Sequence, residues 1–239
     1  MVYTPTTVWQ GYRNASWERL LERGRKRAGE IAEAIAQETG RSLEGRRVLD
    51  YGCGVGRLTI PLAERCERAF GVDIVPSVLE EMRANAAREG LDNVEGLAPT
   101  RLGELAGRYD LLVSLHVLQH IPRGEGEQLL GRLVRGLAPG GVGYVNLVLR
   151  PEHPLRSVLR WSWRSPGTSP PRRNTHPLNP VRWARVLDLS YAYMVRRSYS
   201  LDRLGRVLAA EGVGEWHAHF NPGGGGRAFD AVALIFAKD

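Results

Sequence analysis

The sequence has few cysteines and no long apolar run. Of its 239 residues, only Cys53 and Cys66 are cysteines, which provide neither a framework of several disulfides nor the spacing of a structural metal site. No run of about 18 apolar residues is present, so we expect no transmembrane helix. The first residues, MVYTPTTVWQGYRNASW, lack the basic start and apolar stretch of a signal peptide. These features predict a protein of the reducing cytoplasm.

Lysine is also scarce, and the positive charge is unevenly distributed. Only Lys26 and Lys238 are lysines, and the formal net charge is +7. Residues 150–197 contain ten arginines against Glu152 and Asp188, which gives this segment a net charge of +8. The remainder of the chain is therefore close to neutral. This distribution argues against a surface coated with nucleic-acid-binding charge and predicts one basic patch.

The pattern of apolar residues predicts strands that alternate with helices. The predicted strands cover 46–52, 68–74, 93–97, 109–118, 142–150, 214–220 and 229–238. The predicted helices cover 16–38, 57–67, 76–90, 127–137 and 200–212. At the helix ends we expect N-caps at Ser16 and Ser200, a proline start at Pro76 and glycine stops at Gly40 and Gly90. The alternation predicts an α/β fold with a seven-stranded, mostly parallel sheet and helices on both faces.

Residues 151–197 interrupt this alternation. Seven of the fourteen prolines lie between 151 and 180, and tryptophans such as Trp161 lie among them. The aromatic content argues against a disordered linker. We therefore expect a lid insertion that covers the strand tips and precedes the last helix.

Residues 48–63, VLDYGCGVGRLTIPLA, place a glycine-rich turn between a strand and a helix. Such a turn lets a ligand approach the backbone closely. The glycines follow the pattern G-x-G-x-G, at Gly52, Gly54 and Gly56. Arg57 stands where the dinucleotide fingerprint has its third glycine, which disfavours a nicotinamide cofactor. Asp73 ends the second strand, where its carboxylate can accept hydrogen bonds from a ribose diol. The combination predicts a site for a nucleoside cofactor.

With these features the sequence resembles the class I S-adenosylmethionine-dependent methyltransferases. The motifs that carry the resemblance are VLDYGCGVGRLTIPLA, AFGVDIVPSVLEEMRAN, YDLLVSLHVLQHIP and LAPGGVGYVNLVL, followed near the end by SYSLDRLGRVLAAEGV. The resemblance implies a Rossmann-like fold and S-adenosylmethionine as the cofactor. It divides a single domain into an N-terminal helical segment that can act as a lid, a cofactor-binding core, a substrate-lid insertion and the rest of the core, at 1–45, 46–150, 151–197 and 198–239.

The resemblance also implies which residues contact the cofactor. Asp50 would orient the glycine turn and help to hold the ammonium group, and Asp73 would bind the ribose hydroxyls. Ile74 would pack on the adenine, and Leu115 or His116 would face the methionine part. The family often has an acidic residue after the third strand, which is absent here, so backbone groups of Leu97 and Ala98 would serve the adenine. The expected set is Asp50, Gly52, Cys53, Gly54, Gly56, Asp73, Ile74, Leu97, Ala98, Leu115 and His116.

His116 and His120 are the candidate general bases, because they lie at the end of the fourth strand where the acceptor is expected. Each has a second interpretation: His120 as a cap of the following loop, His116 as a structural or cofactor contact. The sequence after this strand lacks the Asn/Asp-Pro-Pro-aromatic motif of exocyclic-amine methylation, and neither cysteine lies there for cytosine C5 methylation. We therefore expect transfer to oxygen or nitrogen of a small-molecule or lipid-like acceptor. An RNA methyltransferase that grips nucleic acid through 150–197, and a non-catalytic partner subunit, are the alternatives.

The candidate acceptor contacts lie in the basic insertion and at the N-terminus. Residues 153–165 place Arg156, Arg160 and Arg164 on one stripe of a helix, beside Trp161. Such a helix can lie on an anionic membrane, form a lid whose arginines meet an acidic acceptor, or pack on the sheet with its arginines in water. A second aromatic cluster either closes over the cofactor or packs against the first helix; its members are Tyr3, Trp9, Tyr12 and Trp17. The candidate substrate residues are Arg156, Arg160, Trp161 and Tyr12, and no metal site is expected.

Overall fold

The computed structural model describes residues 16–148, 199–222 and 230–239. The strands are β1 Arg47–Tyr51, β2 Arg68–Val72, β3 Val94–Leu97, β4 Tyr109–Leu115, β5 Leu137–Val148, β6 Glu215–Pro222 and β7 Asp230–Ala237. The helices are α2 Trp17–Thr39, α3 Thr59–Ala63, α4 Pro76–Arg88, α5 Arg123–Gly136 and α9 Leu201–Ala210. Two short 3-10 helices are η1 Pro99–Leu105 and η2 Leu118–His120.

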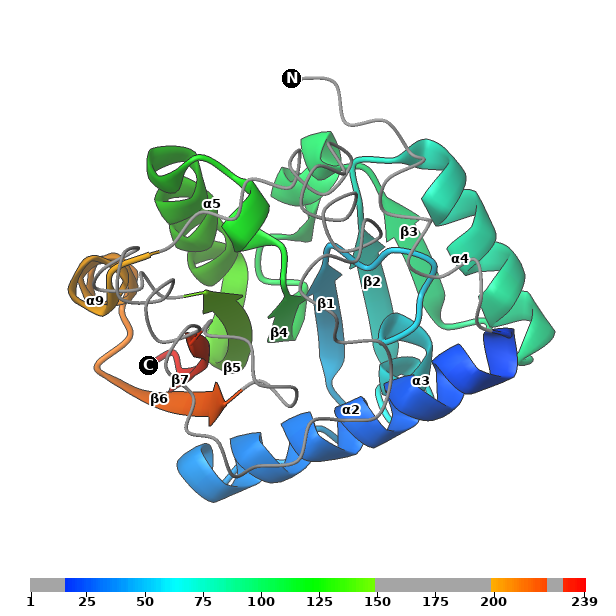
Figure 1. Cartoon of the computed structure of the whole chain (residues 1–239), viewed down its shortest axis with the longest axis horizontal. Coiled ribbons are helices and arrows are strands. Elements are labelled where there is room, and N and C mark those ends of the chain that lie inside the picture. Colours follow the sequence, from blue (N-terminus) through cyan, green and yellow to red (C-terminus); the bar gives the residue numbers. More distant parts are fainter. Residues whose placement is uncertain (1–15, 149–198, 223–229) are drawn as a thin grey trace, which may run out of the picture.

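The described strands form one seven-stranded sheet in the order β3-β2-β1-β4-β5-β7-β6. The pairs from β3 to β5 are parallel, and β7 runs antiparallel to both β5 and β6. Helix α2 lies along one side of the sheet, while α5 and α9 lie on the opposite side (Figure 1). The prediction of a mostly parallel α/β sheet covered on both faces is confirmed.

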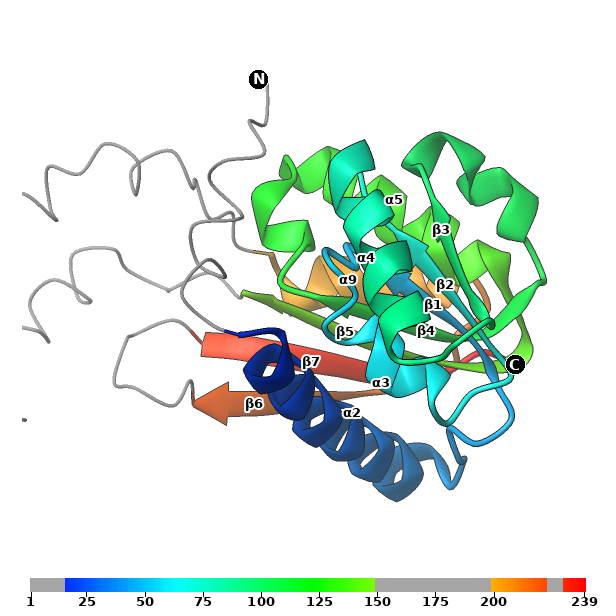
Figure 2. The same ribbon diagram turned by 90° about the vertical axis from the view of Figure 1, so that its right-hand side faces the viewer.

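Alternate side chains of each strand enter two separate cores. On the side of α2 and α3 the core contains Ile31, Ile35, Leu62, Val113 and Ile235, all fully buried. On the side of α5 and α9 the core includes Phe70, Leu112, Leu133, Leu204 and Phe236. Because the central parallel strands are buried on both faces, they consist of nearly continuous apolar residues. Figure 2 shows the strands from the side, with α2 crossing β7 and β6.

The fifth strand differs from its prediction. We expected a turn at residues 139–141 and a strand from 142, but β5 begins at Leu137. Gly140 has a φ of 71° and donates its N–H to the carbonyl oxygen of Lys238 at 3.0 Å. In return, Lys238 donates its N–H to the oxygen of Gly141 at 2.9 Å. Pairing with the chain end therefore extends β5 through the glycines, with a register shift opposite β4.

The other element boundaries agree with the predictions to within a few residues. Gly40 ends α2 with a φ of 66°, and Pro76 opens α4. Ser16 and Ser200 occupy N-cap positions in extended conformations, but neither side chain makes a cap hydrogen bond. Helix α3 is shorter than expected, and the fourth strand ends at Leu115 because the chain turns sharply at the next residue.

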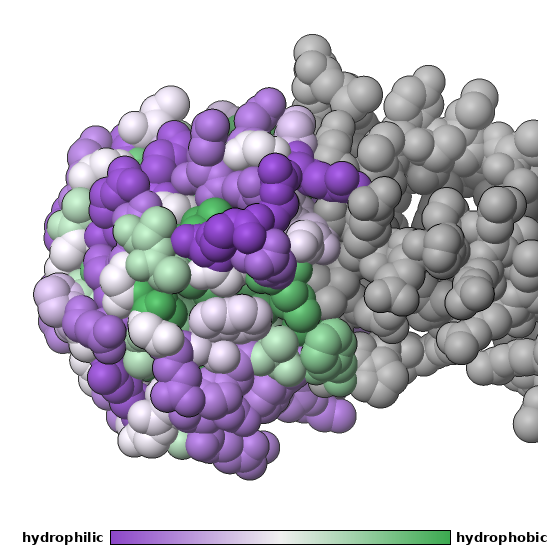
Figure 3. Space-filling model, turned by 90° about the vertical axis from the view of Figure 1, so that its left-hand side faces the viewer, coloured by the Kyte–Doolittle hydropathy of each residue, from purple (hydrophilic) through white to green (hydrophobic). Residues whose placement is uncertain are grey.

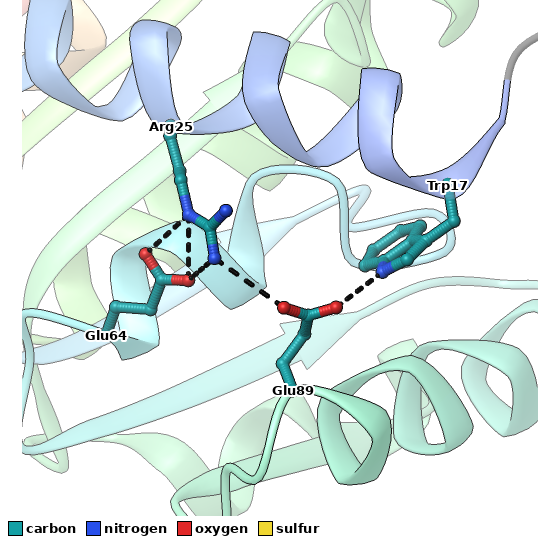
Figure 4. A network of polar contacts seen from close by, with 4 residues as sticks. All are labelled: Trp17, Arg25, Glu64 and Glu89. Carbon is teal, nitrogen blue, oxygen red and sulfur yellow. Dashed lines mark hydrogen bonds and ion pairs between the residues drawn. The ribbon is translucent and has the colours of Figure 1, made fainter.

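Helix α2 is joined to α3 and α4 by a polar network (Figure 4). The indole N–H of Trp17 donates to Glu89 at 2.8 Å, and Arg25 binds Glu64 at 2.6 Å and lies 3.6 Å from Glu89. The Arg25 side chain is 51% exposed, and such exposed ion pairs contribute about 0–1 kcal/mol. Trp17 also packs on a small apolar cluster of Leu21, Ile60 and Ala86. The contacts of Trp17 therefore pack α2 against its neighbouring helices, which agrees with the second of the two interpretations of this residue.

The part of the surface formed by α9 and β6 is mainly hydrophilic, with small apolar groups between the polar residues (Figure 3). Among the described residues, the exposed large apolar side chains are Ile74 and Phe220. No helix within the described ranges has the length and apolar character needed to cross a bilayer. The position of Ile74, after β2, becomes relevant to the site.

Gly24 allows the closest approach of α2 to the glycine-rich turn. A Cβ atom at this position would overlap the backbone carbonyl oxygen of Arg57, whereas a Cβ at Gly29 of the same helix would meet nothing within 4 Å. We predict that Gly24→Ala lowers the free energy of unfolding by about 1–3 kcal/mol, because the helix or the turn must shift. The matched control Gly29→Ala should raise it by about 0.5–1 kcal/mol. Urea unfolding of both variants measures the difference, and equal effects would contradict the contact.

Candidate active site

A cavity of about 380 Å³ opens at the carboxyl ends of β1, β2 and β4. Its walls come from the turn after β1, the residues that follow β2 and the segment between β4 and η2. The lining residues are Asp50, Tyr51, Gly52, Cys53, Gly54, Val55, Arg57, Leu58, Val72, Asp73, Ile74, Val75, Val78, Pro99, Leu115, His116, Val117, His120 and Ile121. Ligand sites of parallel α/β sheets occur at this edge, and the volume lies in the range of small-molecule sites.

The glycine-rich turn is fixed by backbone hydrogen bonds. The N–H groups of Gly52 and Cys53 both donate to the carbonyl oxygen of Val72, at 2.7 and 3.2 Å. Gly52 has a φ of 84°, and a Cβ there would overlap Val117. Gly54 has a φ of 55°, but a Cβ there would meet no atom within 4 Å. Gly54 therefore leaves open space inside the cavity, which a ligand can fill against the bare backbone.

Asp73 connects the second strand to this turn. One carboxylate oxygen accepts the N–H of Gly54 at 3.1 Å, and the other accepts the N–H of Val75 at 3.1 Å. Each oxygen has a second lone pair, and the side chain is partly exposed where it lines the cavity. The carboxylate is thus held in one orientation and can still accept two hydrogen bonds from a diol.

Asp50 forms the buried end of the cavity. Its side chain is 3% exposed, and Thr59 donates a hydrogen bond from Oγ1 to Oδ2 at 2.7 Å. Burial raises the pKa of Asp50 from its ordinary value of 3.8 to about 6, although the Thr59 hydroxyl and the charge of Arg57 act in the opposite direction. A carboxylate in such a position is stabilised when a cation approaches it.

Two histidines line the cavity where the segment between β4 and η2 forms its wall. His116 follows β4 with a φ of 60°, a conformation that non-glycine residues seldom adopt, and donates its N–H to the oxygen of Asn146 at 3.3 Å. His120 ends η2, which is fixed by Tyr199: the buried phenol donates to the carbonyl oxygens of Leu118 at 2.7 Å and Ile121 at 3.1 Å. Strained backbone of this kind is concentrated at functional sites.

Most of the expected cofactor residues lie together in the cavity wall. They are Asp50, Gly52, Cys53, Gly54, Asp73, Ile74, Leu115 and His116, and the candidate base His120 joins them. Burial raises the pKa of the Cys53 thiol well above its ordinary value, which disfavours a thiolate there. The roles assigned to individual residues stay predictions.

Three expected residues are not in the cavity wall. A Cβ at Gly56 would lie 2.7 Å from Met82, so this glycine permits packing of α4. The carbonyl of Leu97 accepts the N–H of Asp73 at 3.3 Å, and Ala98 is exposed, whereas the next residue, Pro99, does line the cavity. The candidate substrate residues are not among those described: Arg156, Arg160, Trp161 and Tyr12. The proposed lid over 151–197 lies outside the described residues as well.

The sequence interpretation missed two supports of the site. Thr59 follows Asp50 by nine positions. The feature that could have indicated its role is a polar residue at the start of an otherwise apolar, buried helix, TIPLA. Tyr199 precedes α9 and reaches η2 through space left by Gly126, where a Cβ would overlap the phenol oxygen. Nothing in the local sequence indicates that contact, because the partners are separated along the chain by about a third of its length.

Comparisons with known proteins agree with the geometry. A family model described as a methyltransferase domain matches residues 48–141. The ubiquinone biosynthesis O-methyltransferase of Alkalilimnicola ehrlichii is 30% identical over 178 residues, which cover 70% of this chain and 69% of that protein. The chain belongs to the class I S-adenosylmethionine-dependent methyltransferases. Its resemblance to that family in sequence is thereby confirmed.

Other relatives of this methyltransferase match over shorter spans. The ubiquinone biosynthesis O-methyltransferase of Nitrosococcus oceani is 38% identical over 161 residues, or 60% of this chain and 63% of the relative. The chain thus spans less than two thirds of that enzyme. A 23S rRNA (uracil(1939)-C(5))-methyltransferase of A. ehrlichii is 38% identical over 108 residues, 43% of this chain but 23% of the relative.

A solved structure has the same fold. Magnesium protoporphyrin IX methyltransferase from Synechocystis, crystallised with bound S-adenosylhomocysteine, superposes with a TM-score of 0.63 over 98% of this chain and 94% of that chain, at 17% identity. The family's cofactor also fits the residues of the present cavity. Gly54 leaves the space that a ligand needs beside the turn, Asp73 has lone pairs for a ribose, and the buried Asp50 suits an ammonium group.

The open space at Gly54 gives a prediction for cofactor-product binding. We predict that Gly54→Ala weakens the binding of S-adenosylhomocysteine by roughly 10- to 100-fold, because its methyl group enters the cavity. Gly90→Ala is the matched control: Gly90 also has a positive φ, 73°, and open space around it, but it lies beyond α4. Both variants should lose similar stability, and calorimetric titration should separate them. Unchanged affinity in Gly54→Ala would show that the ligand lies elsewhere.

The buried Asp50 predicts how stability depends on pH. A pKa of about 6 in the folded protein, above the ordinary 3.8, means that the folded state binds more protons than the unfolded state between these values. The contribution of Asp50 to stability therefore decreases as the pH rises from about 4 to 6, by up to about 3 kcal/mol. Asp50→Asn keeps an acceptor for Thr59 and removes this loss.

Urea unfolding of wild-type protein and Asp50→Asn at pH 4.5 and pH 8 measures this effect. We expect the stability gain of the variant to be about 1–3 kcal/mol larger at pH 8. The exposed residue Asp92 supplies the control, Asp92→Asn, which removes one carboxylate outside the cavity wall. A gain for Asp50→Asn that did not change with pH would contradict the buried, proton-binding carboxylate.

Proposed function

We propose that this methyltransferase transfers the methyl group of S-adenosylmethionine to a hydroxyl oxygen of a small organic molecule. The observation that carries the proposal is the joint position of Gly54 and Asp73, which hold open space and hydrogen-bond acceptors for a nucleoside in one cavity. The acceptor end supports a small, partly apolar molecule, because Leu115, Val117 and Ile121 surround the two histidines there. Similarity to O-methyltransferases of ubiquinone biosynthesis supports oxygen over nitrogen.

The residues of the chain contribute mainly by positioning. When bound, the cofactor supplies an electrophilic methyl group on its sulfonium sulfur. Asp73 and the glycine turn would hold the nucleoside, and Asp50 would hold the ammonium group. Alignment of this kind can supply roughly 7–11 kcal/mol of the barrier reduction. Val117 and Ile121 give this part of the cavity wall apolar side chains, which suit an acceptor that is partly apolar.

The hydroxyl of the acceptor must lose a proton as it reacts. His116 and His120 both line the cavity, and we propose that one of them accepts this proton at a ring nitrogen. A general base of this kind contributes about 10²–10⁴-fold to the rate. The hydrogen bonds of Tyr199 favour His120, because they hold the backbone of the short helix that carries it and so limit where its side chain can lie.

The acceptor is proposed to be acidic or lipid-like because of the basic segment 150–197. Ten arginines in that segment favour an anionic molecule or an anionic membrane surface as the partner. Methylation of RNA receives less support. The rRNA-modifying relative shares 23% of its length with this chain, and the only cysteine in the described cavity wall, Cys53, lies in the cofactor turn with a raised pKa.

Calorimetric titration with S-adenosylhomocysteine tests the cofactor. We predict binding to the wild-type protein and a loss of roughly tenfold or more in Asp73→Ala, because charge-assisted hydrogen bonds contribute about 1.5–3 kcal/mol each. Asp92→Ala removes an exposed carboxylate outside the cavity wall and should bind like wild type. Absence of binding to the wild type would overturn the proposed function.

The acceptor class is tested separately with S-adenosylmethionine labelled in its methyl group. Incorporation into a panel of phenols and hydroxylated lipids is compared with incorporation into total RNA. Label in the small acceptors supports the proposal, while label in RNA that decreases steeply with salt supports the alternative.

A further inference from the structure

The charged side chains in the described wall of the cavity are Asp50, Arg57 and Asp73. Asp73 lies at the end of β2, where its oxygens already hold the turn and face the region suited to a ribose. Asp50, in β1, and Arg57, which precedes α3, lie on either side of the glycine turn along the chain and also line the cavity. Among the described lining residues, Arg57 is the only arginine, and no lysine is present. Besides Asp73, the described cavity wall therefore contains one acidic and one basic side chain.

The backbone of Arg57 is held firmly, whereas its guanidinium is not engaged by the rest of the described structure. Its carbonyl oxygen packs against Gly24 of α2, at a distance that excludes any Cβ. The side chain is partly exposed, and within the described residues it forms neither a hydrogen bond nor an ion pair within 4 Å. Arg83, by comparison, donates to the oxygen of Gly96 at 2.8 Å. Arg57 is thus positioned at the cavity with its donors available.

Asp50 and Arg57 act on each other electrostatically without forming a close pair. The positive charge of Arg57 lowers the pKa of Asp50, against the larger effect of burial. The other groups that affect Asp50 are Thr59, which donates to Oδ2, and Asp73, whose negative charge acts with burial. Since Thr59 occupies Oδ2, the second oxygen of Asp50 is the one available for a ligand.

An amino-acid group matches this arrangement. Its ammonium and carboxylate are attached to the same carbon. A protein that binds both therefore needs a carboxylate for the ammonium and a cationic group for the carboxylate, a short distance apart. We propose that Arg57 binds the carboxylate of the cofactor's methionine part while Asp50 binds the ammonium group. This inference rests on the proposed function and assigns the amino-acid end of its cofactor. A planar guanidinium binds a carboxylate through two parallel hydrogen bonds, which also fixes its orientation.

The assignment gives Arg57 a positive role in cofactor choice. Its position in the motif excludes the third glycine of a dinucleotide fingerprint. Together with Asp50, Arg57 recognises a zwitterion. A ligand without a carboxylate keeps the contact with Asp50 and loses the contact with Arg57. The residue would therefore set affinity for the amino-acid end and leave the adenosine end unaffected.

The test compares two ligands by calorimetric titration of the full chain. One is S-adenosylhomocysteine, and the other is its decarboxylated analogue, which keeps the adenosine, the thioether and the amine. Arg57→Gln removes the charge and leaves the backbone carbonyl against Gly24. Arg23→Gln, an exposed arginine of α2 outside the cavity wall, is the control for the loss of one positive charge. Equal melting temperatures establish that the variants are folded.

We expect Arg57→Gln to bind S-adenosylhomocysteine about 10- to 100-fold more weakly than wild type, and to bind the decarboxylated analogue within about twofold of wild type. Arg23→Gln should match wild type for both ligands. Equal weakening of both ligands by Arg57→Gln, or no weakening of either, would overturn the inference and leave the proposed function intact. If the wild type binds neither ligand, the proposed function itself is overturned.

Discussion

The carbonyl group of Val72 accepts hydrogen bonds from the N–H groups of Gly52 and Cys53, and the rest of the site depends on this contact. It joins the turn after β1 to the last residue of β2, in continuation of the register that pairs Tyr51 with Val72. Asp73 reinforces it from the other side by accepting the N–H of Gly54. Because all of the donors are backbone groups, the position of the turn follows from strand pairing. The sheet therefore positions the cavity, and Thr59 and Tyr199 support its wall at Asp50 and at η2.

The features that could be predicted from the sequence are those encoded locally. Apolar strands, the glycine turn and the acidic end of β2 each occupy a short segment, so their order defines the sheet and brings Asp50 and Asp73 to one edge. Features that depend on distant pairing were missed. The start of β5 at Leu137 requires the chain end at Lys238, and the position of η2 requires Tyr199. The pattern of apolar and polar residues near β5 and η2 does not indicate that these distant residues are their partners.

The glycines show a second limit of motif interpretation. A pattern of alternate glycines indicates close approach but does not tell what approaches. In the structure Gly52 admits Val117 and Gly56 admits Met82, while Gly54 alone of the three has open space in place of a Cβ. Two of the motif's glycines therefore serve packing. The same limit applies after β3, where Pro99, at the start of η1, lines the cavity in place of the expected Leu97 and Ala98.

The buried carboxylate of Asp50 connects stability with ligand binding. Burial disfavours its charged form, and in the protein alone only Thr59 and the more distant Arg57 oppose that cost. An ammonium group placed against Asp50 stabilises the same charge, so a ligand that carries one recovers free energy that the folded protein alone lacks. A ligand that binds only the folded state also stabilises it by mass action. A ligand with a positive charge at this end would therefore gain an interaction with Asp50 that a neutral nucleoside cannot make.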